Sequence, residues 1–302
     1  MPVIEVTSGA ERERWQCEWQ ERLLRLFGES SDNEQWVRHQ ATQRLSHWDT
    51  VEHALFRVDG GWVALSARDQ RTWQLVDLWI EPEERGRGYG RAALRAAIVW
   101  AATKAERLMI AARVGDAAVD KLLAPWPVQA TDMVKPIGDP PVLGSGVAVR
   151  PLRHEEFAAW KSEFVGDYAQ QIASSGMLPP AEAREKSETE HAQLLPDGVD
   201  TAGHTFSCVE SDGSVVARLW LGHASAPSTT WVYRVEVESS QRGKGFGRTA
   251  MLAAEGITLG AGDTQLGLNV FGHNHIALSL YRSVGYRTVR VVRTVPLGQG
   301  EG

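Results

Sequence analysis

Apolar and polar residues alternate in the same order at two places in the chain. The segment "LVDLWIEPEERGRGYG" (75–90) aligns without a gap with "VYRVEVESSQRGKGFG" (232–247), which follows it by 157 positions. In each, the alternation predicts a strand, a short polar turn follows, and a glycine-rich loop leads into an alanine-rich segment that predicts a helix. A fixed offset of this kind indicates an internal repeat.

The repeat extends to both sides of these segments. Upstream, residues 54–69 and 205–222 each place an Asp-Gly pair between two apolar runs, which predicts a β-hairpin. Downstream, residues 107–124 and 265–286 each read as a strand followed by a helix. Residues 135–147, "KPIGDPPVLGSGV", are rich in proline and glycine, as linkers are. We therefore predict two copies of one α/β domain, at 1–138 and 146–302.

Composition narrows the class of protein. The 302 residues carry a net charge of −6, which argues against a nucleic-acid partner held through its phosphates. Two cysteines, Cys17 and Cys208, cannot build a disulfide framework and have no neighbours at metal-ligand spacing. The sequence has no apolar signal segment and no apolar run long enough to span a membrane, so we expect a cytoplasmic protein without membrane contact. The 12 tryptophans predict aromatic cores, with an aromatic substrate cage as the alternative.

The glycine-rich loops carry the candidate chemistry. A backbone amide approaches a phosphate closely only where no Cβ intervenes, and successive amides at the start of a helix form an anion-binding nest. Both loops have this form with basic side chains added: Arg85-Gly86-Arg87-Gly88-Tyr89-Gly90 and Arg242-Gly243-Lys244-Gly245-Phe246-Gly247. The Gly-Lys-Ser/Thr ending of a P-loop is absent, and the preceding strand does not open a dinucleotide-binding βαβ unit. The loops therefore predict pyrophosphate binding of another kind.

These motifs resemble those of the GNAT acetyltransferase superfamily, as two tandem copies that cover essentially the whole chain. The second copy is the more similar: "VEVESSQRGKGFGRTAM" resembles the family's acyl-CoA pyrophosphate motif, and "LGLNVFGHNHIALSLYRSVGY" the next strand and helix. Residues 165–198 resemble the acceptor-side helices of a bacterial small-molecule subgroup. The resemblance implies an α/β (α+β) fold, each domain a mixed, mostly antiparallel sheet flanked by helices. It also implies two central strands that splay around the pantetheine of acetyl-CoA.

The resemblance implies roles for residues of the second copy. Val235 and Val237 would offer backbone groups to the pantetheine and the acetyl carbonyl, and Asn274 would hydrogen-bond the pantetheine arm. Tyr281 would lie near the CoA sulfur as general acid, because a leaving thiolate needs a proton. The structural alternative for Tyr281 is a core aromatic. The residues expected to wrap the pyrophosphate are Arg242, Gly243, Lys244, Gly245, Phe246, Gly247 and Arg248.

The general base in this interpretation is Glu236. Many relatives use an acid on the fourth strand, where Glu236 and Glu238 stand, although strand alternation can direct both away from the reacting groups. Related enzymes often carry Asp two residues earlier, where this chain has Arg234. His273 and His275 are the alternative bases, since imidazole accepts protons near neutral pH; otherwise they are exposed turn residues.

The first copy keeps the loop but lacks the rest of the site. With the offset of 157, Ala117 and Ala124 stand opposite Asn274 and Tyr281. We therefore expect a degenerate first domain without catalytic function, and a second active site with unusual residues is the alternative. The candidate CoA ligands in this copy are Arg85, Gly86, Arg87, Gly88 and Gly90.

These expectations combine into one function. The second domain would move an acetyl group from acetyl-CoA to a primary amine of a small molecule, such as an antibiotic or an amino-acid-derived metabolite, without a metal ion. The acidic balance suits a cationic acceptor. Two alternatives remain: acetylation of protein N-terminal or lysine amines, and a regulatory protein that binds acyl-CoA without turnover. We expect a monomer or a homodimer.

Overall fold

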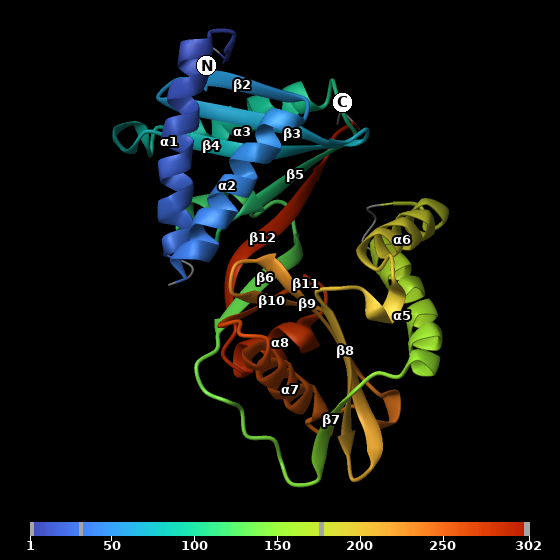
Figure 1. Cartoon of the computed structure of the whole chain (residues 1–302). Coiled ribbons are helices and arrows are strands. Elements are labelled where there is room, and N and C mark those ends of the chain that lie inside the picture. Colours follow the sequence, from blue (N-terminus) through green and yellow to red (C-terminus); the bar gives the residue numbers. More distant parts are fainter. Residues whose placement is uncertain (1–2, 30–32, 175–177, 299–302) are drawn as a thin grey trace. The chain divides into compact units, whose positions relative to one another are not determined.

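The computed structural model describes residues 3–29, 33–174 and 178–298 (Figure 1). Its contacts divide the chain into two compact units. The first unit contains residues 1–133, 270–278 and 287–302, and the second contains residues 134–269 and 279–286. The end of the chain therefore belongs to the first unit. The limits predicted from the sequence repeat, 1–138 and 146–302, stay a prediction.

The first unit is built on a mostly antiparallel sheet. Strands β1 to β5 pair in chain order, and only the pair β4–β5 is parallel. The elements are β1 (Ile4–Glu5), α1 (Gly9–Gly28), α2 (Glu34–Thr50), β2 (His53–Val58), β3 (Gly61–Asp69), β4 (Thr72–Ile80), the 3-10 helix η1 (Pro82–Glu84), α3 (Tyr89–Ala101), β5 (Arg107–Ala112), α4 (Ala117–Leu123) and β12 (Arg287–Pro296). Strand β6 (Val128–Pro136) has residues in both units.

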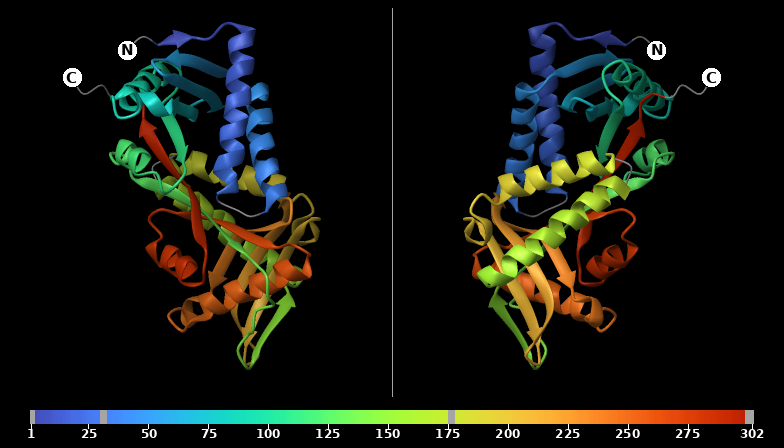
Figure 2. Two further views of the ribbon diagram at one scale, coloured as in Figure 1. Left: turned by 90° about the vertical axis from the view of Figure 1, so that its left-hand side faces the viewer. Right: turned by 90° about the vertical axis from the view of Figure 1, so that its right-hand side faces the viewer.

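Strand β3 separates two hydrophobic cores. Trp62 and Ala64 belong to the core beneath α1 and α2, whereas Val63 and Leu65 belong to the core beneath α3. Successive residues of a strand point to opposite faces, so the alternation of the sequence places one helix layer on each face. Figure 2 shows α1 and α2 side by side. As predicted, tryptophans fill the core beneath these helices: Trp15, Trp19 and Trp48.

The last strand of the chain extends the sheet of the first unit. β12 pairs antiparallel with β5, with Val291 opposite Ala112 and Val295 opposite Leu108. Figure 1 shows β12, in red, beside β5. Val295 is 4% exposed and lies in the core beneath α3. The edge of β5 is therefore covered by a strand from the far end of the chain.

The second unit has the same strand pattern. Strands β7 to β11 pair in chain order, and only β10–β11 is parallel. The elements are β7 (Val147–Pro151), α5 (His154–Ser174), α6 (Pro180–Leu194), η2 (Gly198–Asp200), β8 (His204–Ser211), β9 (Ser214–Ala226), β10 (Thr229–Val237), η3 (Ser239–Gln241) and α7 (Phe246–Gly260). Strand β11 (Gln265–Phe271) and helix α8 (His275–Ser283) have residues in both units. Trp160 and Phe164 of α5 pack against Phe206 and Trp220 of the sheet.

The predicted fold class is confirmed. Each unit has a mixed, mostly antiparallel sheet with helices, and the described residues form eight α-helices. Both predicted hairpins are present, as β2–β3 and β8–β9. At their turns, Gly60 and Gly213 have φ of 65° and 78°, which explains why each Asp-Gly pair ends in glycine.

Candidate functional site

The two parallel strands of the second unit, β10 and β11, are paired over only part of their length. β10 pairs with β11 from Thr229 to Val232, opposite Gln265 to Leu268, yet β10 continues well past that point. Within the residues that the structure describes, the remainder of β10 has no register with β11. In the first unit, β4 likewise continues beyond the residues that pair with β5, which are Thr72 to Leu75. Both units therefore have the splayed strands that the resemblance implies.

The glycine-rich loop of the second unit follows β10 and opens α7. Gly243 and Gly245 have φ of 79° and 89°, in the left-handed region that favours glycine. A Cβ built on either residue meets no atom within 4 Å, so the space beside the loop backbone is open. Gly245 is the N-cap of α7, so the unpaired amides and positive dipole end of this helix begin at the loop. The loop therefore fits an anionic group such as a pyrophosphate.

Basic side chains surround this loop, and all three are exposed: Arg242, Lys244 and Arg248. Each donates to a neutral oxygen: Arg242 Nε to the Val237 carbonyl at 3.3 Å, Lys244 Nζ to Gln241 Oε1 at 3.0 Å and Arg248 Nη2 to Ser283 Oγ at 3.1 Å. Within the described residues, none of the three is in an ion pair. Their positive charges therefore reinforce the anion-binding character of the loop.

The rest of the loop packs against α8. A Cβ on Gly247 would lie 2.9 Å from Leu280 Cδ2, closer than a real contact allows. A larger residue at this position would require the terminal methyl of Leu280 to move. Phe246, the first residue of α7, is half-buried. Gly247 therefore lies close to α8, and Gly243 and Gly245 are explained by the shape of the loop.

Tyr281 is the buried hydroxyl on α8. Its side chain is 6% exposed, and burial raises its pKa to about 12. Its ring centroid lies 5.9 Å from that of Tyr286. Because the pKa is far above neutrality, the hydroxyl stays protonated at pH 7 and can act as a proton donor.

Asn274 directly precedes α8 and is exposed. Its Oδ1 accepts a hydrogen bond from the Ala277 amide at 3.0 Å, which caps the first turn of the helix. The side-chain nitrogen of Asn274 has no partner among the residues that the structure describes, so it is available to donate to a ligand. His273 and His275, the alternative bases, are exposed on either side.

Glu236 points from β10 toward α5. Its Oε2 accepts hydrogen bonds from Trp160 Nε1 at 2.7 Å and from Arg234 Nε at 3.0 Å. Burial acts to raise the pKa of Glu236, but these hydrogen bonds and the charge of Arg234 outweigh it, and the pKa lies below its ordinary value. The carboxylate is therefore ionised at neutral pH.

A model of the acetyltransferase (GNAT) family matches residues 12–123 and 169–286, which together make up most of the chain. The chain belongs to the GNAT family. Among its relatives is the uncharacterized N-acetyltransferase YdgE of Bacillus subtilis, 30% identical over 143 residues, which are 46% of this chain and 91% of that protein. The mycothiol acetyltransferase of Streptomyces griseus is 28% identical over 293 residues, 90% of this chain and 89% of that protein.

A solved structure supports the tandem GNAT architecture. The tandem GNAT protein from the clavulanic acid biosynthesis pathway matches 99% of this chain and 99% of its own, with a TM-score of 0.52 and 15% identity. At this identity the likeness concerns the fold alone. Within the described part of the chain, no group of His, Cys, Asp and Glu side chains is arranged to hold a metal ion. None of the described helices combines the length and the apolar character needed to cross a membrane.

The two GNAT repeats shift by one residue beyond the glycine loop. β4 and β10 start at Thr72 and Thr229, 157 positions apart, but β5 and β11 start at Arg107 and Gln265, 158 positions apart. The pairing confirms this, because Thr72 stands opposite Arg107 and Thr229 opposite Gln265. Two counterparts predicted with the ungapped offset are therefore wrong by one position: Ala117 and Ala124.

With this correction, Asp116 and Leu123 stand opposite Asn274 and Tyr281. Asp116 Oδ1 accepts hydrogen bonds from two first-turn amides of α4, at 2.8 and 3.2 Å. The cap is therefore kept in the first repeat, while the amide donor is lost. Leu123 is 3% exposed, so a hydrocarbon side chain takes the place of the tyrosine. The first repeat still lacks both groups of the predicted site.

The acceptor-side helices also correspond, with a different offset. α1 starts at Gly9 and α5 at His154, 145 positions apart, so Trp15 aligns with Trp160 and Arg22 with Asp167. The single offset of 157 does not align these four residues, so the repeat predicted from the sequence leaves them out. A separate search for repeated helices, with the Trp-x-x-x-aromatic pattern of both, would have found them.

These aligned residues make equivalent contacts. Each tryptophan donates to a carboxylate on the parallel central strand: Trp15 Nε1 to Asp77 Oδ2 at 2.9 Å, and Trp160 Nε1 to Glu236 Oε2 at 2.7 Å. Asp77 occupies the position of Arg234, and Trp79 that of Glu236. In both repeats a tryptophan therefore donates to a carboxylate of the central strand. The aligned positions of the two carboxylates differ by two residues, which lie on the same face of the strand.

Proposed function

We propose that the second repeat transfers an acetyl group from acetyl-CoA to a primary amine of a small molecule. The observation that carries the proposal is the buried, protonated Tyr281 in the repeat whose glycine loop, Asn274 donor and splayed strand are all present. The first repeat keeps the loop and the splay but has Leu123 in place of the hydroxyl. Membership of the GNAT family and the named relatives support acetyl transfer.

The residues fit acetyl-CoA in three places. The open space beside Gly243 and Gly245 would take the pyrophosphate, with compensation by the exposed cations of the loop. The Asn274 side-chain nitrogen would donate to a carbonyl of the pantetheine arm. The backbone of β10 around Val235 and Val237, past the end of its pairing with β11, would bind the arm and the acetyl carbonyl.

The proposed chemistry is direct attack by the amine. Acetyl-CoA supplies an activated acetyl thioester. The neutral amine forms the new C–N bond as the C–S bond breaks, and the Tyr281 hydroxyl gives a proton to the departing sulfur. Glu236, ionised in its hydrogen-bond network, takes the proton that the amine loses, directly or through water. The balance is one proton lost by nitrogen and one gained by sulfur.

Tyr281→Phe tests this proposal. Release of free CoA thiol is measured with acetyl-CoA and a panel of primary amines, and the affinity for acetyl-CoA is measured by calorimetry. We expect kcat to fall at least about tenfold, while the dissociation constant of acetyl-CoA changes less than about twofold. Tyr286→Phe is the matched control, because the buried Tyr286 hydroxyl has no hydrogen-bond partner in the described structure and its loss should leave the rate unchanged. Equal rates for Tyr281→Phe and the parent would disprove the acid role.

A second candidate function is suggested by the first repeat. A glycine loop with left-handed Gly86 (φ 79°) and Gly88 (φ 87°), combined with Leu123, describes a site that binds acyl-CoA without turnover. If no amine, peptide N-terminus or lysine peptide is acetylated while acetyl-CoA binds, the whole chain is a regulatory acyl-CoA-binding protein. If only peptides are acetylated, the acceptor class is protein.

A further inference from the structure

The two carboxylate oxygens of Glu236 have different surroundings. Oε2 accepts hydrogen bonds from Trp160 Nε1 at 2.7 Å and from Arg234 Nε at 3.0 Å. Oε1 accepts none within the described residues, and it is not an enclosed atom. The side chain as a whole is 22% exposed. Oε1 is therefore the oxygen that a ligand can reach, whereas Oε2 is held by two donors.

Trp160 is held rigidly by the core. It is 2% exposed, and its ring meets those of Phe164 and Phe206 edge to face, with centroids 5.4 and 6.4 Å away. Glu236 is the one acceptor of its indole N–H within the described structure. A rotation of the carboxylate away from this donor would leave a buried N–H without a partner, which folded proteins avoid. The packing of Trp160 therefore limits the orientations that Glu236 can adopt.

The first repeat has the same two-donor arrangement on a different residue. Asp77 Oδ2 accepts hydrogen bonds from Trp15 Nε1 at 2.9 Å and from Arg22 Nη2 at 2.5 Å. Asp77 Oδ1 accepts none within the described residues. In both repeats, a tryptophan and an arginine therefore hold one oxygen of a carboxylate and leave the other without a protein partner.

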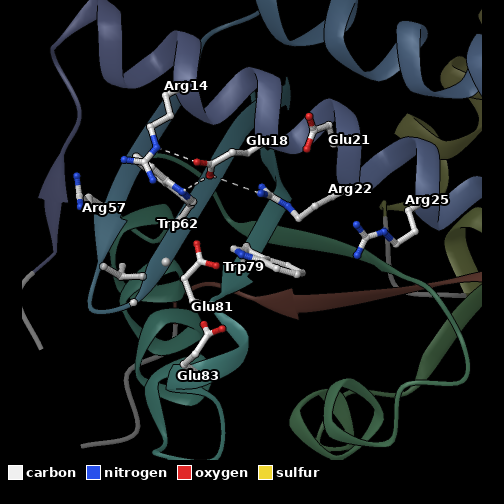
Figure 3. A pocket seen from close by; sticks show the side chains of 13 residues that line it. Arg14, Glu18, Glu21, Arg22, Arg25, Arg57, Trp62, Trp79, Glu81 and Glu83 are labelled. Atoms are coloured by element: carbon white, nitrogen blue, oxygen red, sulfur yellow. Dashed lines mark hydrogen bonds and ion pairs between the residues drawn. The ribbon is translucent and has the colours of Figure 1, made fainter.

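The position of the carboxylate separates the two repeats. Trp79 stands at the position of Glu236 in the first repeat and lines a pocket of about 560 Å³ together with Arg22 (Figure 3). The guanidinium groups of Arg22 and Arg85 lie over its ring, 4.8 and 4.6 Å from the centroid. The second repeat instead has its carboxylate here, on the part of β10 beyond the pairing with β11, where the acetyl carbonyl is proposed to bind. Of the two repeats, the second therefore combines the two-donor arrangement with a carboxylate at the proposed reaction site.

We propose that Trp160 is a positioning residue for the reaction: it holds Glu236 by Oε2, so that Oε1 faces the acceptor amine. This inference rests on the proposed transfer reaction. An N–H bond of the amine breaks as its proton moves to Oε1, directly or through water, and the indole proton stays on Trp160. Burial acts to raise the pKa of Glu236, but the hydrogen bond from Trp160 and the charge of Arg234 bring it below its ordinary value. The base is therefore oriented and unprotonated before the amine arrives.

Trp160→Phe tests the proposal, and Trp220→Phe is its matched control. Each removes an indole that is 2% exposed from the same hydrophobic core, but Trp220 donates its N–H to His204 Nδ1 at 2.8 Å. The carboxyl carbon signal of Glu236 in NMR, assigned with Glu236→Gln, is titrated in the full chain without acetyl-CoA. We expect the proton affinity of this carboxylate to rise about fivefold to tenfold in Trp160→Phe, because a hydrogen bond to the charged form is lost. It should stay unchanged in Trp220→Phe.

Turnover is the second measurement. With acetyl-CoA and an amine that the parent acetylates, kcat of Trp160→Phe should be about threefold to tenfold below that of Trp220→Phe, while KM for acetyl-CoA stays equal. A further variant carries benzothienylalanine at position 160, which keeps the two fused rings and has sulfur in place of the N–H. It should match Trp160→Phe in both measurements, because the packing is retained and only the donor is lost.

Each outcome decides the proposal. It is overturned if Trp160→Phe and the benzothienylalanine variant titrate at Glu236 as the parent does, or if Trp220→Phe changes the titration equally. An altered titration with turnover equal to that of the control also overturns it, because the orientation of the carboxylate would then not affect the rate. An inactive parent would contradict the transfer reaction and this role with it, whereas an active parent with an unchanged titration contradicts this role alone.

Discussion

Arg234 Nη2 lies 2.5 Å from Asp167 Oδ2, and the first repeat has the same ion pair with the charges exchanged. There the helix carries the cation and the strand the anion, as Arg22 Nη2 and Asp77 Oδ2, also 2.5 Å apart. Both pairs connect the first long helix of the repeat to the central strand that borders the splay. The two repeats share this ion pair between helix and strand and differ in which element carries the positive charge.

Exchanging the two charges of the second repeat tests this. Asp167→Arg alone places two guanidinium groups together, and we expect the free energy of unfolding to fall by about 1 kcal/mol, since Asp167 is half exposed. The double variant Asp167→Arg, Arg234→Asp restores a pair of opposite charges between α5 and β10 and should recover part of that loss. The recovery is incomplete because the variant also removes the ion pair of Arg234 with Glu236, where the first repeat has Trp79. Denaturant unfolding of the four proteins of this cycle gives the coupling energy. A double variant as unstable as the sum of the single variants would show that the contact is incidental.

Substitution of the equivalent glycines Gly88 and Gly245 tests which repeat binds acetyl-CoA. Gly245 and Gly88 have nearly the same φ, 89° and 87°, and a Cβ on either meets no atom within 4 Å. Alanine at each position should therefore cost a similar amount, about 1–2 kcal/mol, through backbone strain. Gly245→Ala should also weaken acetyl-CoA binding at least about tenfold. Gly88→Ala is the matched control and should leave that binding unchanged.

The opposite pattern would be informative. If Gly88→Ala alone weakens acetyl-CoA binding, the assignment of the cofactor to the second repeat is wrong. If both variants reduce the measured stoichiometry, both loops bind the cofactor, and the first repeat is an acyl-CoA site in its own right.

Asn274 has one observed role, as the cap of α8, and one proposed role, as a donor to the pantetheine. A single substitution can separate the two roles. Its Oδ1 caps α8, and its nitrogen is the proposed pantetheine donor. Asn274→Asp keeps the cap, as Asp116 does in the first repeat, so unfolding should change by less than about 0.5 kcal/mol. KM for acetyl-CoA should rise about fivefold, the value of one hydrogen bond. Asn274→Ala should lose both properties. Unchanged kinetics in Asn274→Asp would leave the residue as a cap only.

The pH dependence of the rate follows from Tyr281. A general acid works below its pKa, and burial raises that of Tyr281 to about 12. The rate should therefore rise as the acceptor amine loses its proton and then stay level to at least pH 10. The measurement is kcat/KM against pH, with folding checked at each value by circular dichroism. An alkaline decline near pH 9, absent in Tyr281→Phe, would show that the hydroxyl ionises too early for the proposed role.

Local patterns in the sequence predicted the elements and the loops, because alternation and glycine act over a few residues. The hairpins and the glycines of the two loops follow from such patterns, whereas the splay of the central strands was implied by the resemblance to the GNAT family. The one-residue shift does not, because it results from helix length. α7 has 15 residues and α3 has 13, while the connection to the next strand is one residue shorter in the second repeat. An ungapped alignment cannot reveal these two changes in length, because they have opposite signs and leave a net shift of only one residue.

Long-range contacts of single side chains were also beyond the sequence. The sequence predicts Glu236 as a base, but no pattern in it indicates that Trp160 and Arg234 donate hydrogen bonds to this carboxylate. Those contacts depend on how α5 packs on β10, which no local pattern encodes. The exchanged ion pairs could not be predicted for a related reason. Their residues on the helices align at an offset of 145, whereas their residues on the strands align at 157.

The C-terminal strand provides a test of the fold itself. Val295 is buried in the core of the first unit, where β12 covers the edge of β5. Val295→Ala should destabilise that unit by roughly 1–3 kcal/mol through lost burial and a cavity. Amide hydrogen exchange of residues 107–112 should become faster, because β12 protects that edge. Leu268→Ala, an equally buried change on β11 in the second unit, is the comparison and should leave the exchange of residues 107–112 unchanged. Faster exchange in Leu268→Ala but not in Val295→Ala would mean that the last strand does not belong to the first sheet.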